Sequence, residues 1–356
     1  MYKLTSNWPF ITMAYLVFGI VVLSGIKKVY IKERKEINGI FALYETSYLR
    51  GIAALMVLFT HLAQKMSEPG LMYWYWFFGF LSVGFFMFVS GYASYVQFQS
   101  KQQDMFKGYI VKRIIRLFIP FLVIDTIFAI CFRVSFFTYI KSVFTIRLAN
   151  SNDFSQLTPV WFIFTIFYLG MAFYVSYKFF DEKKAMLVDF ILTVAYIAVM
   201  WALGFGFWWY NTAFAYFYGI LYAKYKRQIT DIVQKPVFGF VVVLLVGVLA
   251  GIIFFMSKGH YNFVPQSIAV FVSIIIIIFF FSKCDIRRNI LTYIGNASLE
   301  LFLIQGIRAV YFGNNATRPG IHMVIWIVIV CVIAFILMCI DNWLVKKLMH
   351  LIRRKS

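Results

Sequence analysis

Long runs of apolar residues, separated by short polar stretches, repeat along the whole chain. A helix of about 20 apolar residues is long enough to span the hydrocarbon core of a bilayer. The pattern therefore predicts an all-α, polytopic helical membrane protein with about eleven transmembrane helices. Their expected ranges are 8–26, 49–66, 74–97, 114–136, 159–178, 186–203, 207–223, 237–257, 264–282, 290–311 and 321–345.

The composition agrees with this class. Hydrophobic residues make up 62% of the 356 residues and aromatic residues 21%, and the mean hydropathy is +0.81. Soluble domains contain far less apolar sequence. The longest predicted loop, 137–158, is too short to fold into a soluble domain, so we expect any chemistry to take place between helices.

The net charge of +20 could indicate nucleic-acid binding, but the position of the charges excludes that function. Every second predicted loop is basic, and these loops together hold 26 of the 34 lysines and arginines. Such alternation is the positive-inside signature of a membrane protein. It predicts an N-terminus outside and a C-terminus in the cytoplasm. Lys27 and Lys28 directly follow the first span, which we expect to be retained rather than cleaved as a signal peptide.

The cysteines and histidines show no spacing typical of a metal site or a disulfide framework. The chain has four of each, and neither a CxxC pair nor a glycine-rich phosphate loop is present. We therefore expect no metal cofactor.

Arg50 and His61 are the most informative polar residues because they lie eleven positions apart in an apolar segment. Eleven residues make about three helical turns, so both side chains share one face about 16 Å apart. Ionisable groups in a membrane helix are costly and usually functional. The alternative is that Arg50 flanks the membrane and His61 only packs.

Two further segments carry candidate binding residues. Ser90 and Gly91 lie within the third span, where small residues usually allow helices to pack closely. Arg113 and Arg116 are three residues apart and share a helix face at a predicted cytoplasmic end. They anchor the helix at the interface or form a phosphate-binding pair.

The fifth span opens with Pro159-Val160-Trp161-Phe162. The tenth span contains the polar residues Ser298, Glu300 and Gln305. A carboxylate within a span normally faces the protein interior and has a partner. Glu300 is therefore either a structural ion-pair residue or part of a site.

Taken in order, these segments resemble the integral-membrane acyltransferase 3 family, whose members O-acylate bacterial cell-surface sugars. Arg50 and His61 are similar to the Arg-x10-His pair of the family. Residues 84–92 are similar to its GxxFFxxSGY stretch and residues 113–120 to its RxxRxxxP stretch. Residues 160–162 resemble its LWF motif, and residues 298–305 resemble its SLExYLxH motif.

The sequence departs from the family pattern in two places. Gln305 stands where the family usually has histidine, so this position cannot act as a general base. The first span precedes the usual ten, which divides the chain into an extra N-terminal helix with its basic loop (1–44) and a ten-helix acyltransferase domain (45–356).

The resemblance implies a membrane O-acyltransferase of the bacterial cytoplasmic membrane. It would move an acyl group, most simply acetyl from cytoplasmic acetyl-CoA, to a hydroxyl of a cell-surface polysaccharide or its lipid-linked precursor. In this hypothesis His61 is the general base, about half-way across the bilayer, and Arg50 at the cytoplasmic end orients the donor. The donor site would comprise Arg113, Arg116, Ser90 and Gly91, supported by Glu300, Trp161 and Gln305.

Two other functions remain open from the sequence. A sugar-lipid transporter or flippase could use Arg50 and His61 as substrate or proton-relay groups. A non-catalytic membrane subunit could act with glycan-assembly proteins. Binding of acetyl-CoA distinguishes the enzyme from a transporter, and loss of glycan acylation in His61→Ala distinguishes it from a non-catalytic subunit.

Overall fold

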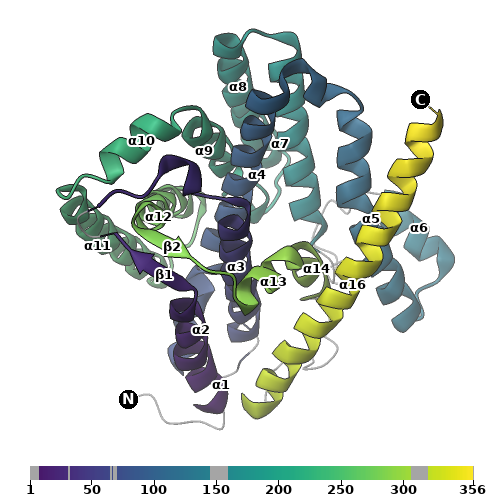
Figure 1. Ribbon diagram of the computed structural model, residues 1–356. Helices are drawn as coiled ribbons and strands as arrows, with labels where there is room; N and C mark the ends of the chain where they lie inside the picture. Colours follow the sequence, from purple (N-terminus) through teal and green to yellow (C-terminus); the bar gives the residue numbers. More distant parts are fainter. Residues whose placement is uncertain are drawn as a thin grey trace.

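The computed structural model describes residues 8–30, 33–64, 66, 70–144, 159–305 and 320–355. This part of the chain is almost entirely helical, and its long helices pack side by side into one bundle (Figure 1). The long helices are α3 (Leu43–Ala63), α4 (Gly79–Lys101), α5 (Tyr109–Cys131), α7 (Val160–Phe179), α8 (Glu182–Ala202), α11 (Phe238–Ser257), α12 (Phe263–Lys283) and α16 (Gly320–Lys355).

Shorter elements connect these helices. They are α1 (Trp8–Thr12), the π-helical turn η1 (Met13–Val17), α2 (Phe18–Ser24), η2 (Ile37–Gly39), η3 (Gly70–Phe77), η4 (Gln102–Phe106), α6 (Phe136–Phe144), η6 (Phe207–Trp209), α9 (Ala213–Lys224), α10 (Lys226–Val233), α13 (Ile290–Asn296) and α14 (Ser298–Ile304). Two short strands, β1 (Ile26–Val29) and β2 (Cys284–Ile286), complete the fold.

Eight helical segments of the described residues are long and apolar enough to cross a membrane. They include all eight long helices and correspond to eight of the predicted spans. The chain is therefore a polytopic helical membrane protein, as the apolar pattern predicts. Where the helices face neighbours their side chains are buried. In α11 only Met256 is buried, so most of this helix would face lipid.

Three predicted spans differ from the structure. The first, 8–26, contains an apolar helix only from Phe10 to Ser24, which is about 22 Å long at 1.5 Å per residue. The span 207–223 begins as a 3₁₀ turn, so its α-helix has only 12 residues. The span 290–311 is divided into α13 and α14 at Ala297, and residues 306–311 lie outside the described residues.

A close helix crossing positions α13 and α14. A Cβ added to Gly51 of α3 would lie 2.0 Å from the backbone oxygen of Leu291, and one added to Gly295 would lie 1.7 Å from that of Ser47. Only glycine permits this approach. The crossing holds α13 against α3 next to Arg50 and places α14 between α3 and α16 (Figure 1).

The strands β1 and β2 form an antiparallel pair that the helical pattern does not predict. Ile26 faces Ile286 and Val29 faces Cys284. The backbone N–H of Arg287 extends the pairing by donating to the oxygen of Gly25 at 2.7 Å. The pair joins two loops, 27–50 and 283–288, that the charge pattern assigns to the same side of the membrane.

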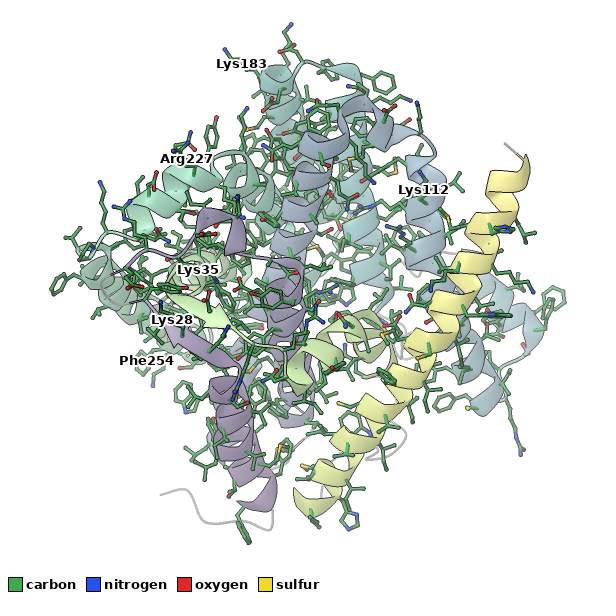
Figure 2. All side chains as sticks on the ribbon, in the orientation of Figure 1. Lys28, Lys35, Lys112, Lys183, Arg227 and Phe254 are labelled. Carbon is green, nitrogen blue, oxygen red and sulfur yellow. The ribbon has the colours of Figure 1, made fainter. Side chains whose placement is uncertain are left out.

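Other basic loops also gather at one end of the bundle. Lys112, Lys183 and Arg227 lie in the upper part of Figure 2, where the last turns of α16 also lie. The N-terminal helix α1 lies at the opposite end (Figure 1). This arrangement is that expected for basic loops on one face of a membrane.

Candidate functional site

A cavity of about 360 Å³ opens at the basic end of the bundle. Four cationic residues, Lys101, Lys112, Arg113 and Arg116, line it, with Asp104 as the carboxylate among its lining residues. The remaining lining residues are Ser90, Ala93, Ser94, Gln97, Met105, Tyr109, Leu117, Ile166 and Met349. The cavity therefore combines a cationic surface with apolar and hydroxyl-bearing walls from α4, η4, α5, α7 and α16.

Arg113 is fixed in the wall of this cavity. Its Nη1 donates to the Tyr109 hydroxyl at 3.1 Å, and its Nη2 donates to the backbone oxygen of Ile166. The guanidinium lies against Gly170 of α7, where an added Cβ would be only 1.9 Å from Cζ. These contacts preorganise the guanidinium, which lowers the entropic cost of binding an anion.

Arg116 and Ser90 complete the set of predicted residues in the cavity. Arg116 is exposed and makes neither a hydrogen bond nor an ion pair with the described part of the chain. Its charge is therefore available to a ligand. Ser90 comes from α4, across the cavity from the two arginines of α5.

Gly91 has a different role from that predicted. A Cβ at this position would lie 1.9 Å from the backbone oxygen of Tyr216, and one at Gly219 would lie 2.0 Å from that of Phe88. Both glycines therefore allow α4 and α9 to cross closely. Gly91 packs against α9 and does not line the cavity, because it is one residue, or 100° of helix, away from Ser90.

Arg50 lies deeper in the bundle than the predicted cytoplasmic end. It is two turns into α3, its Nη2 donates to Ser47 Oγ at 3.0 Å, and its Nε has no hydrogen-bond partner. Its charge interacts with that of Glu300 on α14. Arg50 is not among the residues that line the cavity.

His61 lies in the last turn of α3, not half-way along it. Its Nδ1 is 3.0 Å from Oε1 of Gln64. This contact orients the imidazole ring at the end of α3. Arg50 and His61 are about 16 Å apart along α3, so they cannot act on the same atom.

The supporting residues lie around α14. Glu300 is 6% exposed, and its Oε2 has no hydrogen-bond partner. Trp161, in the first turn of α7, packs edge-on against Phe302 with ring centroids 6.1 Å apart. Gln305 is buried at the end of α14. Glu300 and Gln305 therefore belong to α14 and its end, and Trp161 packs against the same helix. None of the three lines the basic cavity.

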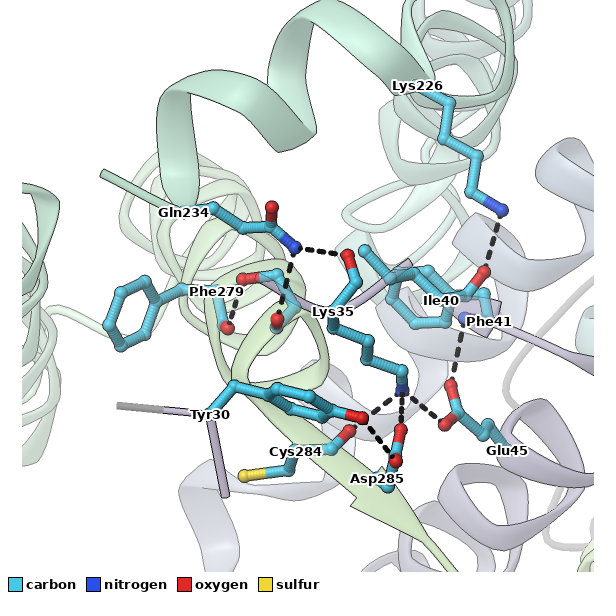
Figure 3. A network of polar contacts seen from close by, with 11 residues as sticks. Tyr30, Lys35, Ile40, Phe41, Glu45, Lys226, Gln234, Phe279, Cys284 and Asp285 are labelled. Carbon is cyan, nitrogen blue, oxygen red and sulfur yellow. Dashed lines mark hydrogen bonds and ion pairs between the residues drawn. The ribbon is translucent and has the colours of Figure 1, made fainter. Parts of the chain in front are cut away.

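Sequence reasoning missed a buried polar network between the N-terminal segment and the core (Figure 3). The amine of Lys35, only 4% exposed, binds Glu45, lies 2.8 Å from the backbone oxygen of Cys284 and 3.4 Å from Asp285 Oδ1. Gln234 donates to the Lys35 oxygen at 2.9 Å. The network joins residues on both sides of the predicted boundary at 44/45, so the extra segment packs as part of the same bundle.

Lys226 extends this region toward α4. Its amine donates to the backbone oxygen of Ile40 at 2.7 Å and to the Tyr92 hydroxyl at 2.9 Å. Burial lowers the pKa of Lys226 to about 8, because the charged form loses hydration. No sequence motif indicated this contact, because the charge pattern assigns Lys226 to a predicted cytoplasmic loop with other basic residues.

The bundle of apolar helices and the cationic cavity at one end define an integral membrane protein equipped to bind an anion. Comparison with known protein families matches residues 43–341 to the acyltransferase domain Acyl_transf_3. This match covers most of the chain, so the protein belongs to the acyltransferase 3 family and is an acyltransferase. No curated protein and no solved structure matches the chain significantly.

Proposed function

We propose that this acyltransferase moves an acetyl group from cytoplasmic acetyl-CoA to a hydroxyl of a cell-surface polysaccharide or its lipid-linked precursor. The observation that carries the proposal is the cavity with Lys101, Lys112, Arg113 and Arg116. Coenzyme A carries several phosphate charges, and arginine binds phosphate with two parallel hydrogen bonds.

The cavity suits the rest of the donor as well. Met105, Leu117 and Met349 offer apolar contacts beside the cations. The phosphates would rest on the basic residues, and the pantetheine arm would carry the thioester from the cavity into the bundle. Arg113 is held rigidly by Tyr109 and by Ile166, so it is the best-positioned phosphate ligand of the four.

Transfer requires a base for the acceptor hydroxyl. The hydroxyl oxygen attacks the thioester carbonyl carbon, the carbon–sulfur bond breaks, and the hydroxyl proton passes through a base to the departing thiolate. His61 suits this role because an imidazole can take up and release a proton near neutral pH, and the contact with Gln64 orients the ring. Arg50 lies about 16 Å from His61 along α3, so it would contact a part of the substrates away from the reacting hydroxyl.

Titration of the purified full-length protein in lipid nanodiscs with acetyl-CoA tests the donor site. We expect saturable binding that weakens roughly tenfold to a hundredfold in Arg116→Ala, because one charge-assisted contact is lost. Lys183→Ala is the matched control, since Lys183 lies at the same end of the bundle but outside the cavity. Equal affinities in wild type, Arg116→Ala and Arg113→Ala would place the donor elsewhere.

Mass analysis of surface glycans tests the acceptor. A strain that lacks the protein should lose acetyl groups from its polysaccharide, and the wild-type chain should restore them. A transporter or flippase has no use for acetyl-CoA, so its loss would change the amount of exported glycan and leave its acetylation unaltered.

A further inference from the structure

Two buried carboxylates lie in the core with hydrogen-bonding capacity that the protein does not use. Asp341 of α16 is 2% exposed, and neither of its oxygens has a hydrogen-bond partner. Glu300 of α14 is 6% exposed, with Oε2 also unpartnered. Buried polar atoms are nearly always paired in folded proteins, so three unpaired carboxylate oxygens require an explanation.

These groups belong to one cluster with Arg50. The helix α14 packs against both α3 and α16 and lies between them in Figure 1. The charge of Glu300 interacts with those of Asp341 and Arg50. Arg50 donates to Ser47 Oγ and leaves its Nε without a partner, so it does not satisfy the free oxygens of these carboxylates.

The chemistry of the cluster defines what would complement it. Ionised carboxylates only accept hydrogen bonds, so a ligand must offer donors. The unpartnered Nε–H of Arg50 would in turn donate to an oxygen of the ligand. A polyhydroxyl compound meets both demands because each hydroxyl donates and accepts, whereas the phosphates of coenzyme A would be repelled by the carboxylates.

We propose that Asp341 and Glu300 together bind the hydroxyl groups of the acyl acceptor, with Arg50 donating a hydrogen bond to a hydroxyl oxygen. This inference rests on the proposed acyl transfer to a glycan, and it adds Asp341 as an acceptor-binding residue. None of the three residues lines the basic cavity, so donor and acceptor bind at separate places in the bundle.

Stability and function should change in opposite directions at this position. A buried carboxylate without partners destabilises the fold, because its lost hydration is not replaced. If Asp341 served only the fold, Asp341→Asn would stabilise the protein at no functional cost. If Asp341 binds the acceptor, the same change stabilises the protein and weakens acceptor use.

The experiment uses the full-length protein in nanodiscs and three measurements on each variant. These are the thermal unfolding midpoint, the acetyl-CoA affinity, and the KM for lipid-linked glycan extracted from a strain that lacks the protein. For Asp341→Asn we expect a higher midpoint, unchanged acetyl-CoA affinity, and a KM raised roughly tenfold or more. Asp341→Glu should recover part of the KM.

Asp189→Asn is the matched control. Asp189 of α8 is 0% exposed and its oxygens also lack hydrogen-bond partners, but its charge does not act on Glu300. Asp189→Asn should raise the thermal unfolding midpoint and leave the KM for the glycan unchanged. If Asp341→Asn does not accumulate, Glu300→Gln carries the same expectations.

Several results would overturn the inference. An unchanged KM in Asp341→Asn would remove Asp341 from the acceptor site while leaving the proposed function intact. Loss of acetyl-CoA affinity in parallel with acceptor use would make Asp341 a structural residue. Stabilisation of wild type by sodium, but not by choline, that disappears in Asp341→Asn would assign the cluster to a cation. A wild-type protein that binds acetyl-CoA but acetylates nothing in the extract would refute the proposed acceptor and this inference together.

Discussion

Replacing Gly170 with alanine tests whether the fixed position of Arg113 matters for donor binding. The added Cβ would lie 1.9 Å from Cζ of Arg113 and 2.0 Å from its Nε. Ordinary van der Waals contact begins at 3.4 Å, so the guanidinium must retreat by about 1.5 Å, the difference between the two distances. A shift of this size removes the guanidinium from its hydrogen bonds with Ile166 and Tyr109.

The expected magnitude follows from those contacts. A hydrogen bond to a charged group contributes ~1.5–3 kcal/mol, and 1.4 kcal/mol corresponds to a factor of ten in affinity. If Arg113 holds one phosphate, Gly170→Ala should weaken acetyl-CoA binding about tenfold to a hundredfold. The fold should survive, because the displaced group is a flexible side chain that lines a cavity.

The assay is calorimetric titration of the protein in nanodiscs with acetyl-CoA, with the thermal unfolding midpoint measured in parallel. Gly247→Ala is the control, since an added Cβ at that helical position meets nothing within 4 Å. Both substitutions carry the same helix-propensity gain, about 1 kcal/mol, which therefore cancels.

A double-mutant cycle makes the test specific. In an Arg113→Ala background the added methyl group has no guanidinium to displace, so Gly170→Ala should have no further effect on affinity. Affinity that is normal in Gly170→Ala but low in Arg113→Ala would show that the observed position of Arg113 is not the one that binds the donor. Additive losses would mean that Gly170 acts by another route.

Three further predictions concern other parts of the chain. His61→Ala should lower kcat by ~10²–10⁴ with unchanged acetyl-CoA affinity. Gln64→Leu should lower kcat less, because it removes a contact that orients the imidazole and leaves the base in place. Normal rates in both variants would exclude His61 as the base. The pKa of Lys226 is lowered from 10.5 to about 8, so between these pH values the unfolded chain binds more protons than the folded one. The stability of the wild type, relative to Lys226→Met, should therefore rise with pH across that window. Identical pH profiles of the unfolding midpoint in the two proteins would contradict the burial argument. After cysteine substitution in intact cells, Trp8 should react with an impermeant thiol reagent and Arg227 should not; the opposite labelling would invert the topology.

The sequence alone determined the membrane class and most of the long helices. Apolar length is a local property, so eight predicted spans correspond to helices of the structure. The pattern also identified the family and brought attention to Arg113, Arg116 and Ser90, which line one cavity. The grouping of the two arginines was predictable because basic residues gather on one side of a membrane.

The tertiary structure alone decided how the core residues meet. The approach of Asp341 to Glu300 depends on α14 lying between α3 and α16, and that position depends on the Gly51–Gly295 crossing. Gly91 shows the same limit, since its sequence context fits either a ligand-binding residue or a helix crossing. Small residues allow close approach, but the partner helix is chosen by the whole bundle, so no local pattern reveals it.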